Sequence, residues 1–124
     1  MSTDGPQGKD DQLKELRDAQ RRFAAARDWD QFHSPKNLAM ALSVEVSELL
    51  EHFQWMPEAT STLLSPEKRA KVKEEIADVL LYLVRLADKL DVDLAASAFE
   101  KMKLNAAKYP TDKARGNMKK YSDL

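Results

Sequence analysis

The chain has 124 residues, and its 20 Lys and Arg nearly balance its 21 Asp and Glu, which gives a formal net charge of −1 with His neutral. This length fits one domain, and the balance argues against a protein that holds a nucleic acid polymer through its overall field. The absence of Cys excludes disulfides, thiolate metal sites and a Cys nucleophile.

The composition favours helices over sheets. Only 3 Gly and 5 Pro occur, whereas a sheet-rich fold with many tight turns usually needs more Gly. No apolar run is long enough to span a membrane, and residues 1–10 are polar and acidic, unlike a secretory signal. We therefore expect an all-α protein of the cytoplasm that binds no membrane.

The N-terminal part begins with a polar lead. Residues 1–8 show no apolar period, and we expect them to be disordered. A first helix is predicted from residue 9 to about residue 27, because Leu13, Leu16 and Phe23 recur at helical spacing. A connector rich in aromatic residues follows, from Arg27 to His33.

Two Ser-Pro pairs mark the next helix starts, since Ser is a good N-cap and Pro suits the first helical position. Ser34-Pro35 opens a helix predicted to run to about Trp55, where Met56-Pro57 stops it, and Ser65-Pro66 opens one to about Leu90. A fourth helix is expected from Asp91 or Asp93 to about Lys108, followed by a basic tail over 111–124. These elements predict a four-helix bundle over 9–110.

Carboxylates interrupt the apolar faces of the second and third helices. At about 100° per residue, Glu45 and Glu48 fall on the stripe that also holds Leu38 and Leu49. Glu75 and Asp78 lie three residues apart on the third helix, flanked by apolar residues. If the two helices are neighbours, four acidic groups converge.

Converging carboxylates need a counterion, because like charges in a poorly solvated site raise each other's pKa and destabilise the fold. Mg²⁺ suits this role, since it takes a few carboxylate oxygens and keeps waters for a phosphate substrate. A single Glu-x-x-Glu on a charged helix is usually a solvated face, so the argument depends on there being two such pairs on apolar stripes.

Other site chemistries lack their motifs. A di-iron bundle needs Glu-x-x-His on two helices, and neither helix carries it. The zinc motif His-Glu-x-x-His, a P-loop and a Gly-x-Ser-x-Gly elbow are also absent from the sequence.

The acidic pairs are part of a wider pattern that resembles the MazG-like all-α nucleoside triphosphate pyrophosphohydrolases, and within them the dCTP pyrophosphatase branch. The pattern consists of Glu45-x-x-Glu48, Glu75-x-x-Asp78, residues 27–33, Pro35-x-Asn37-Leu38, Phe53-Gln54-Trp55, residues 78–84, Tyr109-Pro110 and Lys120-Tyr121. The resemblance covers about residues 13 to 124, with 9–110 as the MazG-like helical domain.

This resemblance implies an enzyme that hydrolyses a nucleoside triphosphate to the monophosphate and pyrophosphate with Mg²⁺. It implies that Glu45, Glu48, Glu75 and Asp78 are the metal ligands and catalytic residues, and that a glutamate of the second helix orients or deprotonates the attacking water. It also implies homodimers, or dimers of dimers, with sites at subunit boundaries. The expected role is sanitation of the nucleotide pool.

The resemblance also implies a set of substrate contacts. The base and sugar pocket would be formed by Trp29, Asp30, Gln31, Phe32, His33 and Trp55, while Tyr82, Asn105 and Lys108 would meet the sugar or phosphates. One position departs from the dCTP branch, because Gln20 stands where that branch has a histidine facing the nucleotide. An amide can hydrogen-bond but carries no charge, which leaves the base preference open.

Two alternatives remain. One is an all-α pyrophosphatase with broad or different specificity, for dUTP, oxidised nucleotides or ribonucleotides. The other is a non-catalytic helical module that binds a nucleotide or a partner helix.

Overall fold

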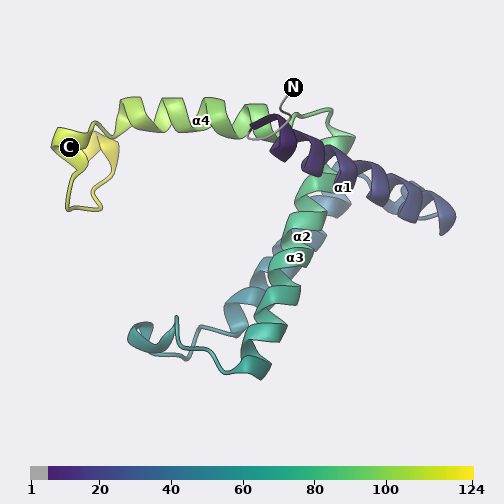
Figure 1. Cartoon of the computed structure of the whole chain (residues 1–124), viewed down its shortest axis with the longest axis horizontal. Helices are drawn as coiled ribbons and strands as arrows, with labels where there is room; N and C mark the ends of the chain where they lie inside the picture. The colour runs from purple at the N-terminus through teal and green to yellow at the C-terminus, as the bar shows by residue number, and fades with distance from the viewer. Residues whose placement is uncertain (1–5) are drawn as a thin grey trace. The chain divides into compact units, whose positions relative to one another are not determined.

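The computed structural model describes the backbone of residues 6–124 and the side chains from residue 12 onward (Figure 1). Four long helices occur in this range. In chain order the helical elements are α1 (Pro6–Ala26), η1 (Asp30–Phe32), α2 (Pro35–Glu51), η2 (Glu58–Thr60), α3 (Pro66–Lys89), α4 (Leu94–Lys108), α5 (Thr111–Ala114) and η3 (Tyr121–Asp123). No strand is present between residues 6 and 124, so the all-α prediction is confirmed. In the same range no helix combines the length and apolar character needed to cross a bilayer.

The chain divides into two compact units, the first ending at Val92 and the second running from Asp93 to Leu124. The predicted lead over 1–8 falls mostly outside the described residues, and α1 already begins at Pro6. The sequence-based division into 9–110 and 111–124 stays a prediction.

The predicted helix starts are present with their caps. The Ser34 hydroxyl accepts a hydrogen bond from the Asn37 amide at 3.1 Å, and Ser65 accepts one from Lys68 at 3.1 Å. Asp93 caps α4 in the same way, accepting from Ala96 at 3.0 Å. These bonds satisfy amide donors that the first helical turn leaves without partners.

The second helix ends earlier than the sequence predicts, at Glu51 instead of Trp55. Residues 52–56 form turns instead, in which the Phe53 amide donates to Leu50 and the Met56 amide donates to Phe53. Pro57 disfavours helical backbone at Met56, and the chain leaves the helix before that point. Trp55 is left on this turn with 88% of its surface exposed.

Two helices end in the same hydrogen-bonded cap, with an Asp in the left-handed region. Asp28 has φ 53° after α1, and Asp91 has φ 55° after α3. The Trp29 amide donates to Ala24 at 2.9 Å, and the Val92 amide donates to Ala87 at 2.8 Å. This is the pattern of a Schellman motif, in which Asp is tolerated because its short side chain visits this backbone region more readily than most.

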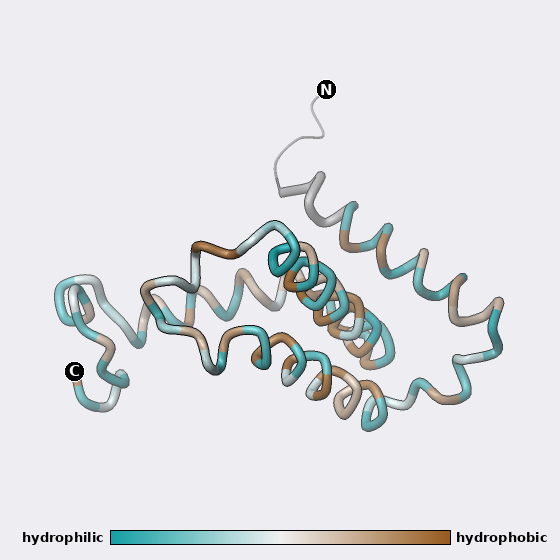
Figure 2. Tube along the Cα trace, turned by 90° about the horizontal axis from the view of Figure 1, so that it is seen from below, coloured by the Kyte–Doolittle hydropathy of each residue, from teal (hydrophilic) through white to brown (hydrophobic). Residues whose placement is uncertain are grey.

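In the first unit, α2 and α3 pack side by side and α1 packs against α3 (Figure 1). Hydrophobic and hydrophilic residues alternate along these helices with helical period (Figure 2). Between residue 12 and Val92 the buried apolar side chains are few: Ala24, Leu38, Val72, Val84 and Ala87. Many larger apolar side chains on the same helices are exposed, which is unusual for a chain that stays alone in water.

The second unit contains α4, α5 and η3. Within it, the rings of Tyr109 and Tyr121 meet edge to face at 6.2 Å, and the Lys108 ammonium lies 4.8 Å from the centre of the Tyr121 ring. None of the α4 side chains is buried.

Candidate metal and nucleotide site

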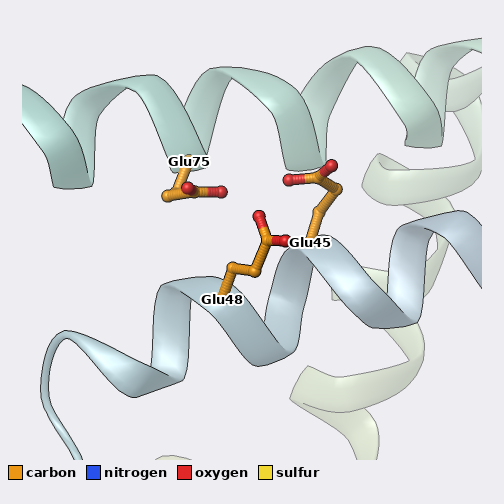
Figure 3. Close-up of side chains that lie close together, drawn as sticks. All are labelled: Glu45, Glu48 and Glu75. Carbon is orange, nitrogen blue, oxygen red and sulfur yellow. The ribbon is translucent and has the colours of Figure 1, made fainter.

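Three glutamates from α2 and α3 point into the space between the two helices (Figure 3). Glu45 and Glu48 come from α2 and Glu75 comes from α3, and one carboxylate oxygen of each lies within 4.8 Å of the others. All three side chains are half-buried. The packing of α2 along α3 therefore brings together residues that lie thirty positions apart in sequence.

Two oxygens of this cluster are buried without a hydrogen-bond partner. They are Oε2 of Glu45 and Oε2 of Glu75. A buried carboxylate oxygen that lacks a donor costs free energy, so this pair calls for a partner such as a cation, a water or a proton.

The environment raises the pKa of Glu45 to about 7 from its ordinary value of 4.5. Burial is the largest cause, followed by contact with the Glu75 carboxyl and then by the negative charges of Glu48 and Asp78. The fourth predicted ligand is thus close enough to act on Glu45, although Asp78 is exposed and lies outside the group of three.

The cluster fits a hard divalent cation. It offers only carboxylate oxygens, which Mg²⁺ and Ca²⁺ prefer, and no soft or nitrogen ligand. A cation there would provide the missing partner for the two buried oxygens.

The aromatic connector begins with Trp29, which is placed by the Schellman motif at the end of α1. Its ring lies 5.7 Å from that of Phe23 at 67°, an edge-on contact of the kind that often closes this motif. The Arg27 guanidinium covers the Phe23 ring at 3.6 Å. Trp29 remains 45% exposed and Phe32 60% exposed, so part of each side chain is open to a ligand.

The polar residues of the connector are engaged within the protein. The Gln31 amide nitrogen donates to the Asp28 backbone and side chain at 2.9 and 3.0 Å. The Asp30 carboxylate accepts from Arg85 and Lys89 of α3. His33 is half-buried and accepts through Nδ1 from Arg85 at 3.1 Å.

The remaining predicted contacts are spread over the chain. Tyr82 is half-buried on α3, seven residues after Glu75, and Trp55 is almost fully exposed. Asn105 and Lys108 are exposed on α4 in the second unit. Gln20 is half-buried on α1, and its amide nitrogen is buried with no hydrogen-bond partner.

Sequence reasoning missed Arg85, which contacts two residues of the connector and is 5% exposed. A signal was present, because Arg85 is the only charged residue in the run Val79–Ala87. A charge inside an apolar helical stretch needs acceptors within the protein, which makes it a candidate for a specific role.

A comparison with models of known protein families assigns the chain to one of them. The model of the MazG-like family matches residues 40–124, and the chain belongs to this family. The resemblance inferred from the sequence is thereby confirmed.

Individual curated proteins and a solved structure show which members of the family the chain resembles. The chain is 46% identical over 114 residues to the dCTP pyrophosphatase 1 of Bos taurus, covering 90% of this chain and 68% of the bovine protein. The identity to the dCTP pyrophosphatase 1 of Homo sapiens is also 46%, covering 67% of the human protein. A solved pyrophosphatase from Archaeoglobus fulgidus superposes with a TM-score of 0.75 at 41% identity, over 80% of this chain and 93% of the archaeal one.

Proposed function

We propose that this chain is a Mg²⁺-dependent nucleoside triphosphate pyrophosphohydrolase that converts dCTP, or a modified dCTP, and water to the monophosphate and pyrophosphate. The observation that carries the proposal is the inward-facing cluster of Glu45, Glu48 and Glu75 with its two unpartnered buried oxygens. The 46% identity to proteins named dCTP pyrophosphatase 1 supports the reaction and the base. Such an activity would remove unwanted triphosphates from the cytoplasmic nucleotide pool.

In this proposal Glu45, Glu48, Glu75 and Asp78 are the metal ligands and catalytic residues. These carboxylates would hold Mg²⁺, which would neutralise phosphate charge and lower the pKa of a nearby water. A glutamate of α2 orients the attacking water and accepts its proton. The water oxygen bonds to phosphorus, the bond from phosphorus to the bridging oxygen breaks, and pyrophosphate leaves.

The proposed base pocket uses the exposed aromatic rings. Trp29, Phe32 and Trp55 offer flat apolar faces, and base stacking on such a face contributes about 1–3 kcal/mol. His33 adds a polar edge, and Tyr82 on α3 would meet the sugar or phosphates. Asn105 and Lys108 stay proposed contacts of the phosphate tail.

We also propose that the chain works as a homodimer or a tetramer. Its first unit leaves large apolar side chains uncovered on α2 and α3, with exposed fractions of 57% for Met40, 58% for Leu50 and 55% for Ile76. A second copy that covered these faces would remove an exposed apolar surface that water disfavours. Sedimentation equilibrium of the native protein tests this, and a monomer at micromolar concentration would refute it.

The experiment is hydrolysis of each deoxynucleoside triphosphate, dUTP and CTP with Mg²⁺, followed by measurement of pyrophosphate and monophosphate. The matched variants are Glu48→Gln and Asp78→Asn in the proposed site and Glu51→Gln on the exposed face of α2. We expect dCTP to be the best substrate, and we expect the two site variants to lose at least about a hundredfold in rate. Glu51→Gln should keep the native rate.

The outcomes separate the alternatives. Orthophosphate as product, or full activity in both site variants, would contradict the proposed reaction. Comparable rates for several triphosphates would indicate a broad pyrophosphatase. Nucleotide binding without turnover would indicate the non-catalytic module.

A further inference from the structure

Arg85 is a buried cation on α3 that contacts the connector after α1 and Asp88 on its own helix. Its Nε donates to His33 Nδ1 at 3.1 Å, its Nη2 to Asp30 at 2.6 Å and its Nη1 to Asp88 at 3.4 Å. Asp88 also accepts two hydrogen bonds from Arg21 of α1. Asp88 is therefore shared by Arg85 of its own helix and Arg21 of α1, and it connects the Arg85 guanidinium to α1.

The contact with His33 determines where the imidazole carries its proton. A guanidinium has only donors, so the Nδ1 atom that it meets must be an acceptor without hydrogen. A neutral histidine in that state is protonated on Nε2. Burial, and after it the charges of Arg85 and Lys89, lower the pKa of His33, which favours this neutral form.

The backbone of the connector is held at several other points. The Asn37 side chain donates to the Phe32 carbonyl at 3.0 Å, and Gln31 is bound to Asp28. Lys89 reinforces Arg85 at Asp30. Within this segment the rings of Trp29 and Phe32 are exposed in part, and the half-buried His33 contacts Arg85 through Nδ1, which leaves its Nε2 outside that contact.

We infer that Arg85 is a positioning residue for the base pocket, which holds Asp30 as an anchor of the connector and fixes His33 as a donor through Nε2–H. The atom that His33 meets is then a hydrogen-bond acceptor, such as a carbonyl oxygen of a pyrimidine base. The identity of that ligand rests on the proposed function, whereas the proton position and the anchoring role of Asp30 rest on the geometry of the native protein alone.

The first test needs no substrate. Nitrogen-15 NMR of the imidazole groups distinguishes a ring nitrogen that carries hydrogen from one that does not. We expect His33 in the native protein at neutral pH to carry hydrogen on Nε2 only. A proton on Nδ1, or a positively charged His33 at that pH, would overturn the inference.

The second test compares Arg85→Met and Arg85→Lys with Arg21→Met, which removes a guanidinium from the same ionic network without touching the connector. For dCTP hydrolysis we expect Arg85→Met to raise KM about tenfold, the equivalent of about 1.4 kcal/mol, with kcat within about twofold of native. Its His33 should show both tautomers. Arg85→Lys should recover part of the KM, and Arg21→Met should leave KM and the tautomer as in the native protein.

An unchanged KM in a folded Arg85→Met protein would overturn the positioning role, as would an equal rise in KM in Arg21→Met. If Arg85→Met does not fold, Arg85→Lys decides, because it keeps the charge but cannot donate to three acceptors in the guanidinium geometry. A native protein that hydrolyses no triphosphate would refute the proposed function, while the tautomer of His33 would still decide the geometric part.

Discussion

Replacing Glu45 by Gln should stabilise the metal-free protein at alkaline pH and abolish its stabilisation by Mg²⁺. Glu45 has a pKa of about 7 in the fold against an ordinary value of 4.5, so its ionised form is disfavoured by folding. At about 1.36 kcal/mol per pKa unit this difference corresponds to about 3 kcal/mol. Solvent reaches part of the side chain, and we therefore expect about 1–2 kcal/mol in the free energy of unfolding.

The sign of the pH dependence follows from the raised pKa. The destabilisation by Glu45 is complete above the folded value of about 7, shrinks as the pH falls towards 4.5, and is absent below 4.5. Glu45→Gln should thus unfold at higher urea concentration than the native protein at pH 8 in EDTA, and the two midpoints should converge on acidification. The comparison is made at one protein concentration, with Glu51→Gln as the control.

Added Mg²⁺ should reverse the order of the two proteins. The cation stabilises the native protein through the carboxylates that the variant lacks in part, so the native midpoint should rise and that of Glu45→Gln should move little. A variant that is less stable than the native protein at pH 8 without metal would refute the reasoning, and so would an equal gap at pH 5 and pH 8.

Three further substitutions and conditions have direct readouts. Trp55→Ala should change the free energy of unfolding by less than about 0.5 kcal/mol, because the residue is 88% exposed. The same substitution should raise the KM for dCTP severalfold. A large loss of stability in urea would contradict a surface position. Leu38→Ala removes a side chain that is 1% exposed and should cost about 2–5 kcal/mol by the same measurement, with a cost below about 1 kcal/mol contradicting the core assignment. A hydrogen bond from Arg21 lowers the pKa of Asp88, and one from Lys89 lowers the pKa of Asp30. The two carboxylates therefore stabilise the fold above the ordinary pKa of 3.8, and this stabilisation is lost as the pH falls through their folded pKa values. In an acid titration of the free energy of unfolding, Arg21→Met should lose less stability than the native protein.

The parts of the fold that follow from local chemistry could be predicted from the sequence. Ser34 and Ser65 cap their helices as expected, because a hydroxyl before Pro satisfies the first amides whatever the rest of the chain does. The end of α2 was harder to predict from the sequence, because Trp55 continues the apolar period although the helix already ends before His52. Period alone does not distinguish a last helical turn from a wide turn before Pro57.

The acidic cluster could also be predicted from the sequence, because two pairs at helical spacing on apolar stripes can face each other if the two helices are neighbours. Its finer geometry was not, and the structure groups Glu75 with the α2 glutamates while Asp78 is exposed. The contacts of Arg85 with Asp30 and His33 span more than fifty residues, and no local pattern encodes such a pairing. The sequence therefore indicated Asp30 and His33 as ligand contacts, whereas in the fold the Asp30 carboxylate already accepts hydrogen bonds from Arg85 and Lys89.

Both tryptophans are proposed contacts of the base, and neither lies in the apolar core: Trp29 is 45% exposed and Trp55 is 88% exposed. The intrinsic fluorescence of this protein should consequently report occupancy and not compactness. The Trp55 part of the emission should shift little on denaturation, because an indole that is 88% exposed has little further to move into water. A stacked base, by contrast, should quench the indole that it contacts, so nucleotide binding could be followed by the fluorescence of the protein itself.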